Sequence, residues 1–153
     1  MDVSGEFSIP AQRQTVWEAL NDPEILRQCI PGCESIESGE DNQMTATMRA
    51  KIGPVKAKFT SVITLSDLDP PAAYTISGEG KGGPAGFGKG QARVTLEEAD
   101  EGTILRYEAD LQVGGKLAQI GSRLVAGAAR KIADDFFATF TKVVSPDAED
   151  AEA

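Results

Sequence analysis

The chain has 153 residues, a formal net charge of −9 and no histidine. A chain of this length can bury a hydrophobic core as one soluble domain without disulfides or metal ions. The acidic balance argues against nucleic-acid binding, which needs clustered lysine and arginine, and the missing histidines remove the commonest general base and metal ligand.

The N-terminal part of the chain predicts one strand followed by two short helices. Residues 2–9 (DVSGEFSI) alternate small or apolar residues with polar ones, as in a half-buried strand. The next segment, RQTVWEALNDPEILRQC, has apolar residues at helical spacing, interrupted at Asn21-Asp22-Pro23. The first residues, MDVSGEFSIP, have neither the basic nor the apolar region of a signal peptide. We therefore expect a cytoplasmic protein.

Cys29 and Cys33, the two cysteines, flank an Ile30-Pro31-Gly32 turn after the second helix. The pair admits three interpretations: a redox couple, half of a metal site, or small buried side chains at a corner. Without histidine, a zinc site would need carboxylates to complete it, which is an uncommon ligand set. We expect a packing role, with no metal and no cofactor.

Six more strands are predicted by alternation after this turn. They begin at Cys33 and continue through residues 44–52, 55–65, 74–81, 88–98 and 103–113, joined by short turns such as Gly53-Pro54. Consecutive strands with short connections indicate an antiparallel meander.

The C-terminal part predicts one long helix over residues 117–143. Its apolar stripe runs from Leu117 to Phe140 at helical spacing. The expected fold class is therefore α+β: a seven-stranded antiparallel sheet curved around this helix, in a single domain of residues 1–143. Residues 144–153 carry acids and no base, and we expect them to form a disordered tail.

Two glycine-rich motifs resemble nucleotide-binding sequences without their context. GEGKGG (78–83) matches the dinucleotide fingerprint, and GPAGFGK (83–89) matches most of a phosphate-binding loop. Both nucleotide sites require a helix directly after the glycines, whereas here a strand follows. A glycine-rich hairpin is the better interpretation.

Small residues recur at inward strand positions and on the C-terminal helix. Two such surfaces either approach closely or leave a gap, and we favour a gap that holds a hydrophobic ligand. The predicted ligand-binding residues are Phe7, Met44, Met48, Phe59, Ser61, Ile63, Tyr107, Leu117, Ile120, Gly121, Leu124 and Ala128.

Four basic residues lie on the outward rows of the predicted hairpin around Gly53-Pro54. They are Arg49, Lys51, Lys56 and Lys58, with no acid between them in the sequence. This face is either a solvated surface that resists aggregation or a docking contact for an acidic partner or anionic lipid head groups.

Four blocks, PGCESIE, IGPVKAKF, GGPAGFGKGQARVTL and the Gly/Ala-rich final helix, resemble the CoxG family of proteins associated with carbon monoxide dehydrogenase. The resemblance implies the START-like (SRPBCC) helix-grip fold and a cavity for a hydrophobic molecule. It also implies an association with molybdenum-containing CO dehydrogenases and related hydroxylases, and our leading hypothesis is a non-catalytic carrier of quinone or lipid that serves such an enzyme. The alternatives are a polyketide-cyclase-like enzyme and an assembly or docking factor without a ligand. Some family members carry a C-terminal membrane anchor, whereas this chain ends in DAEDAEA, so we expect at most transient membrane contact.

Overall fold

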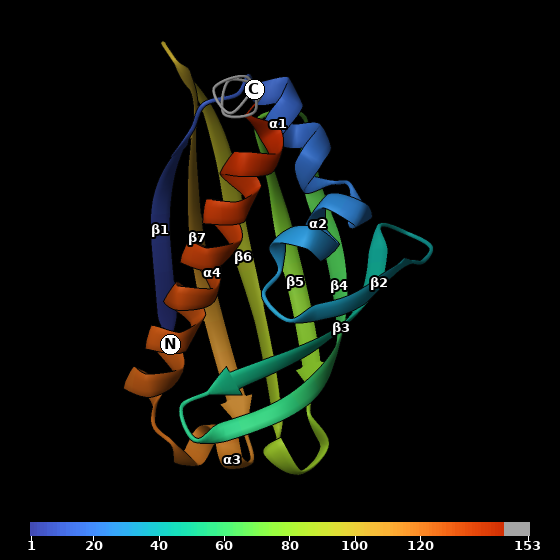
Figure 1. Cartoon of the computed structure of the whole chain (residues 1–153), viewed down its shortest axis with the longest axis vertical. Helices are drawn as coiled ribbons and strands as arrows, with labels where there is room; N and C mark the ends of the chain where they lie inside the picture. Colours follow the sequence, from blue (N-terminus) through green and yellow to red (C-terminus); the bar gives the residue numbers. More distant parts are fainter. Residues whose placement is uncertain (146–153) are drawn as a thin grey trace.

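The computed structural model describes residues 1–145, and its framework is one curved antiparallel sheet (Figure 1). The predicted acidic tail, from residue 146 onward, lies outside the described residues. The seven strands are ordered β1-β7-β6-β5-β4-β3-β2 in the sheet. Their bounds are β1 Asp2–Ile9, β2 Cys33–Ser38, β3 Gln43–Ile52, β4 Val55–Asp69, β5 Ala73–Lys81, β6 Phe87–Ala99 and β7 Gly102–Gly114.

The helices cover the concave face of this sheet. They are α1 Arg13–Leu20, α2 Pro23–Cys29, α3 Lys116–Gln119 and α4 Ser122–Val144, with a 3-10 turn η1 at Gly83–Ala85. The long helix α4 crosses in front of β6 and β7, and α1 and α2 lie beside its C-terminal half (Figure 1). The α1–α2 break falls where predicted, with Asp22 accepting a hydrogen bond from the Glu24 amide and Pro23 in the first turn. The predicted α+β helix-grip architecture is confirmed.

The C-terminal helical region differs from its prediction in two details. The expected single helix is two helices, because Gly121 has a φ of +96° and separates α3 from α4. Glycine alone adopts this backbone conformation easily. The helix also continues to Val144, which is buried, one residue past the expected boundary.

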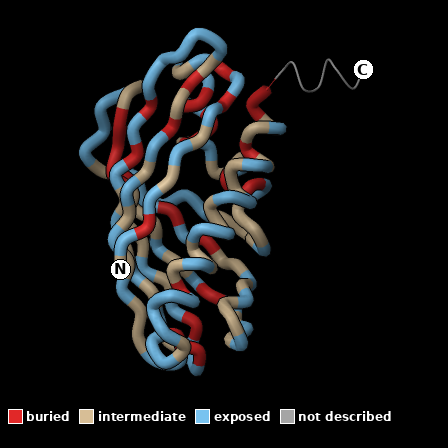
Figure 2. The backbone as a smooth tube through the Cα atoms, turned by 90° about the vertical axis from the view of Figure 1, so that its left-hand side faces the viewer, coloured by how far each residue is buried: buried red, intermediate tan, exposed pale blue. Residues whose placement is uncertain are grey.

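The main hydrophobic core occupies the end of the molecule where α1, α2 and the C-terminal half of α4 meet the sheet. Phe140, Ile9, Leu105 and Val16 are almost fully buried there. A smaller cluster of Phe59, Ala85 and Leu117 lies where β4, η1 and α3 meet. Buried or half-buried positions alternate with exposed ones along much of the strands, as one-sided packing requires (Figure 2). The space between the two clusters holds the candidate site.

Candidate functional site

A cavity of about 460 Å³ lies between the concave face of the sheet and α4. It is lined by side chains from β3 to β7, α3 and the first half of α4. The inward-facing members are Ile30, which follows α2, and Ala46, Met48, Ala50, Ile52, Phe59, Ser61, Ile63, Ile76, Ala92, Ala109, Leu111, Val113, Leu117, Val125, Ala128, Ala129 and Ile132. All are apolar except Ser61, so the cavity suits a hydrophobic guest.

Small residues create this space. Gly78 pairs with Gly90, and Gly80 with Gly88, on the adjacent strands β5 and β6, so bare backbone forms part of the cavity wall. A Cβ added at Gly78 or Gly88 would meet nothing closer than 3.7 Å, whereas one at Gly80 or Gly90 would lie within 2.7 Å of the Ser61 or Leu111 side chain. Gly80 and Gly90 are thus required for close packing within the sheet, and the cavity shows that between the sheet and α4 the facing small residues leave a gap.

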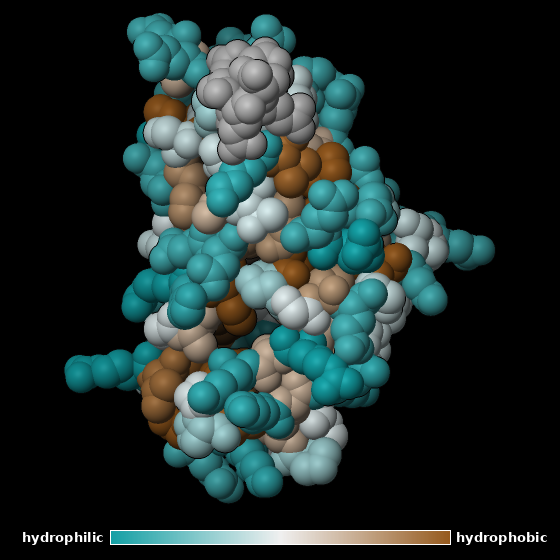
Figure 3. All heavy atoms as spheres, viewed as in Figure 1, coloured by the Kyte–Doolittle hydropathy of each residue, from teal (hydrophilic) through white to brown (hydrophobic). Residues whose placement is uncertain are grey.

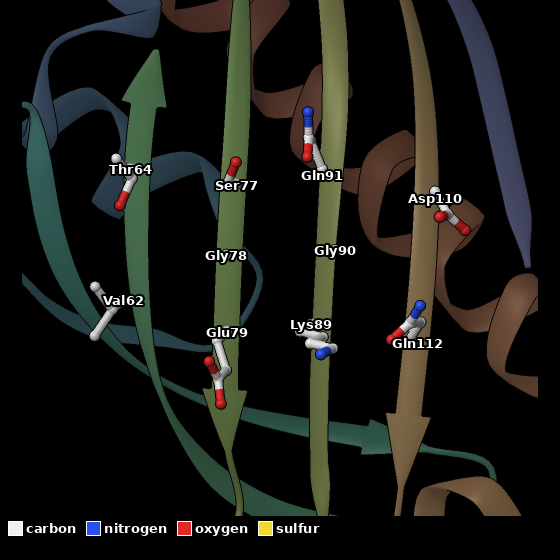
Figure 4. Close-up of a pocket in the computed structure, with 10 residues that line it drawn as sticks. All are labelled: Val62, Thr64, Ser77, Gly78, Glu79, Lys89, Gly90, Gln91, Asp110 and Gln112. Carbon is white, nitrogen blue, oxygen red and sulfur yellow. The ribbon is translucent and has the colours of Figure 1, made fainter.

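The charged side chains of these strands lie on the opposite face. Figure 4 views the sheet from outside, with α4 behind it, and shows Glu79, Lys89 and Asp110 around the same glycine pair. The shallow recess there has a volume of about 430 Å³ and a polar lining. The sheet thus separates a charged outer surface from an apolar interior.

Six of the predicted ligand-binding residues lie at the cavity. They are Met48, Phe59, Ser61, Ile63, Leu117 and Ala128. Several lining residues were not singled out, including Ala129, Ile132, Leu111 and Val113. Most of these residues lie on the same alternating strand positions and the same apolar helix stripe as the six predicted ones.

Three other residues, Phe7, Met44 and Tyr107, were predicted to line the cavity but pack in the main core instead. The Phe7 ring lies 4.4 Å from that of Phe137, centroid to centroid. The Tyr107 ring covers Gly5, where a Cβ would lie 2.7 Å from it. The physical reason is that α4 changes from alanine and glycine in its first half to phenylalanine in its second. The phenylalanines fill the gap that the small residues leave open.

The remaining three predicted residues lie at or beside the mouth of the cavity. Ile120 and Leu124 line a groove on the outside, and Leu124 is 45% exposed. Gly121 lies at the α3–α4 junction, and an added Cβ would meet nothing within 4 Å. Gly121 is exposed and lines neither the cavity nor the groove, which corrects its prediction.

This mouth groove has a volume of about 790 Å³ and lies between β3, the Pro31–Gly32 turn and α4. It shares Ala50, Ala128 and Ile132 with the cavity, so the two spaces adjoin. In Figure 3, hydrophobic atoms are visible in a hollow between α4 and the strands facing it. The groove is therefore the candidate passage for a ligand.

Gly32 fixes one lip of the groove. Its φ is +74°, and a Cβ there would lie 2.1 Å from the Arg49 carbonyl oxygen. The Arg49 amide also donates a hydrogen bond of 3.0 Å to the Gly32 oxygen. Both the backbone conformation and the close approach require glycine.

The flanking cysteines are free thiols. Burial raises the pKa of Cys29 to about 11, and it also raises the pKa of the half-buried Cys33. Cys33 donates to the Ser35 carbonyl oxygen over 3.5 Å. Residues 1–145 contain no cluster of metal-ligating side chains. The geometry agrees with a packing role for both cysteines.

The predicted basic hairpin face is present but partly neutralised. Lys51 pairs across the strands with Lys56, and Arg49 with Lys58. Glu34 on β2, which is not among the predicted site residues, contacts Arg49 at 2.8 Å and Lys58 at 3.2 Å. These two cations, Arg49 foremost, lower the pKa of the Glu34 carboxyl. No local sequence signal pointed to Glu34, because it lies on a separate strand.

Comparison with known proteins identifies relatives. Residues 5–145 match the family model of CoxG, which is described as a carbon monoxide dehydrogenase subunit. A conserved protein from Geobacillus kaustophilus has a similar structure, with a TM-score of 0.89, 34% identity and 95% of each chain covered. No curated protein matches the sequence.

More distant structures share the fold. Ara h 8.0201 has a TM-score of 0.64 at 16% identity, covering 94% of this chain and 97% of its own. The Zhui aromatase/cyclase from Streptomyces sp. R1128 has a TM-score of 0.62 at 14% identity, covering 94% and 93%. Within residues 1–145, no helix combines the length and apolarity needed to cross a membrane.

Proposed function

The chain belongs to the CoxG family of carbon monoxide dehydrogenase subunits, and we propose that it is a non-catalytic carrier of a hydrophobic small molecule, a quinone or a lipid. The apolar cavity under α4 is the observation that carries this proposal. Its volume of about 460 Å³ falls within the usual range of small-molecule sites, about 300–1,000 Å³.

The proposed partner is a molybdenum hydroxylase of the CO dehydrogenase type. The family description supports this, and so does the basic hairpin face, which would meet an acidic patch on the enzyme. Lys51 and Lys56 are the proposed main contacts, because Glu34 already forms ion pairs with the other two basic residues, Arg49 and Lys58. Opposite charges speed encounter, and the effect weakens with salt.

A polyketide-cyclase-like enzyme on this fold is the alternative, and the Zhui aromatase/cyclase shows that the fold can accommodate such chemistry. That chemistry needs a positioned acid or base at the ligand. Tyr107, the inward-facing candidate, packs in the core, and burial there raises its pKa. Ser61 offers a hydroxyl but no basic partner among the inward-facing side chains of the cavity. The lining therefore favours a carrier.

Displacement of a neutral fluorescent probe tests the proposal. N-phenyl-1-naphthylamine should fluoresce strongly in the presence of the protein, and a decyl-chain quinone or dodecanol should displace it at a stoichiometry of one. A protein that neither enhances the probe nor binds either compound would contradict the carrier function.

A further inference from the structure

Four basic residues line the mouth groove, and two of them are already paired. Arg49 contacts Glu34, and Lys131 contacts Asp135 at 2.9 Å. The other two, Lys51 and Arg123, form no ion pair and no side-chain hydrogen bond with any residue in 1–145. The groove thus contains two uncompensated positive charges in a chain of net charge −9.

These two cations come from opposite walls. Lys51 belongs to β3, near the hairpin turn, and Arg123 to the first turn of α4. The apolar floor that they flank includes Ala50 and Ala128, which also line the cavity. A molecule that extends from the cavity into the groove would therefore pass between two positive charges.

The cavity itself cannot hold a charge. Its inward-facing side chains are apolar apart from Ser61. Transferring an ionised group into such surroundings without a partner is strongly unfavourable. A charged end of a ligand would remain at the mouth, where water and the two cations solvate it.

We propose that the natural ligand is an amphiphile with an anionic head group, a carboxylate or a phosphate. Its hydrocarbon chain fills the cavity, and its head group lies in the mouth groove between Lys51 and Arg123. The inference rests on the proposed carrier function and narrows it, because a neutral quinone head would gain nothing from the two charges.

A ligand series with one chain and different head groups tests the proposal. Dodecanoate, dodecyl phosphate and methyl dodecanoate are compared by displacement of N-phenyl-1-naphthylamine at neutral pH and low ionic strength. We expect one or both anions to bind about tenfold more tightly than the ester, the size that two exposed charge contacts support. Added salt should reduce the difference. Whichever anion binds more tightly identifies carboxylate or phosphate as the preferred head group.

Charge-neutralising variants locate the head group. Lys51→Gln combined with Arg123→Gln should abolish the preference for anions and leave ester binding unchanged. Lys89→Gln, on the outer face of the sheet (Figure 4), removes one positive charge and should keep the preference.

The outcomes separate the two proposals. Equal binding of anions and ester by the unaltered protein would overturn the head-group inference and leave the carrier function standing. A preference that survives in the double variant would also overturn it. If no member of the series displaces the probe, the carrier function fails, and the head-group inference fails with it.

Discussion

Filling the cavity should abolish ligand binding without destabilising the fold. Ala129 lines the cavity from α4, on the face that also presents Val125, Ala128 and Ile132. Ala129→Phe would place a phenyl ring in the cavity of about 460 Å³. Ala138, in the same helix, is exposed, so Ala138→Phe is the matched control with a similar helix-propensity cost.

The two explanations of the small residues predict opposite effects on stability. Burying a phenylalanine side chain stabilises a protein by about 1.5–3 kcal/mol relative to leaving it exposed. In a domain of this size, 1 kcal/mol shifts the melting temperature by about 2–4 °C. Ala129→Phe should therefore melt about 3–12 °C above Ala138→Phe. In a close-packed interface the added ring would instead cost about 1–3 kcal/mol.

Differential scanning calorimetry and probe displacement on the two variants decide between these explanations. We expect ligand affinity to fall at least about tenfold, or 1.4 kcal/mol, in Ala129→Phe and to stay at the wild-type value in Ala138→Phe. If Ala129→Phe melts below the control and still binds the ligand at full affinity, the cavity argument is refuted.

Three further predictions concern the turn, the thiol and the basic face. Gly32→Ala should lower the free energy of unfolding, measured in urea, more than Gly83→Ala does. Both positions have positive φ, but only at Gly32 would the added Cβ collide with backbone. Equal losses of stability in the two variants would contradict this. Because burial raises the pKa of Cys29 from 9.0 to about 11, its alkylation by iodoacetamide should stay slow at neutral pH and speed up towards that value. The Cys29 thiol ionises at lower pH in the unfolded chain than in the folded protein, so the stability that the buried thiol contributes is complete below pH 9 and is lost towards pH 11. Cys29→Ala should remove that part of the alkaline destabilisation. Rapid alkylation at pH 7 would contradict the raised pKa. Lys56→Glu, which leaves the groove residue Lys51 unchanged, should slow association with the hydroxylase at low salt and flatten its salt dependence, measured by surface plasmon resonance. Unchanged rates would leave the hairpin as solvated surface.

The strands were predictable because one-sided burial imposes a period of two on the sequence. The α1–α2 break was predictable because Asp22 and Pro23 are strong helix-start signals. The break at Gly121 was missed because a glycine between apolar residues at helical spacing looks like a tolerated interior position. Only its backbone φ reveals the interruption.

The position of the cavity along α4 was not predictable from the strands. Tyr107 and Leu111 share the inner face of β7, yet the first packs in the core and the second lines the cavity. The difference lies in what faces them from α4, phenylalanines in one case and alanines in the other. The Glu34 contacts were missed for a different reason, because they depend on the register in which β2 pairs with β3.

The most direct test of the carrier account is mass spectrometry of the small molecules released by denaturation of the natively purified protein. We expect about one hydrophobic molecule per chain, and none from Ala129→Phe purified in parallel. A wild-type protein that yields no such molecule, and that remains empty after incubation with quinones and lipids, would contradict the account.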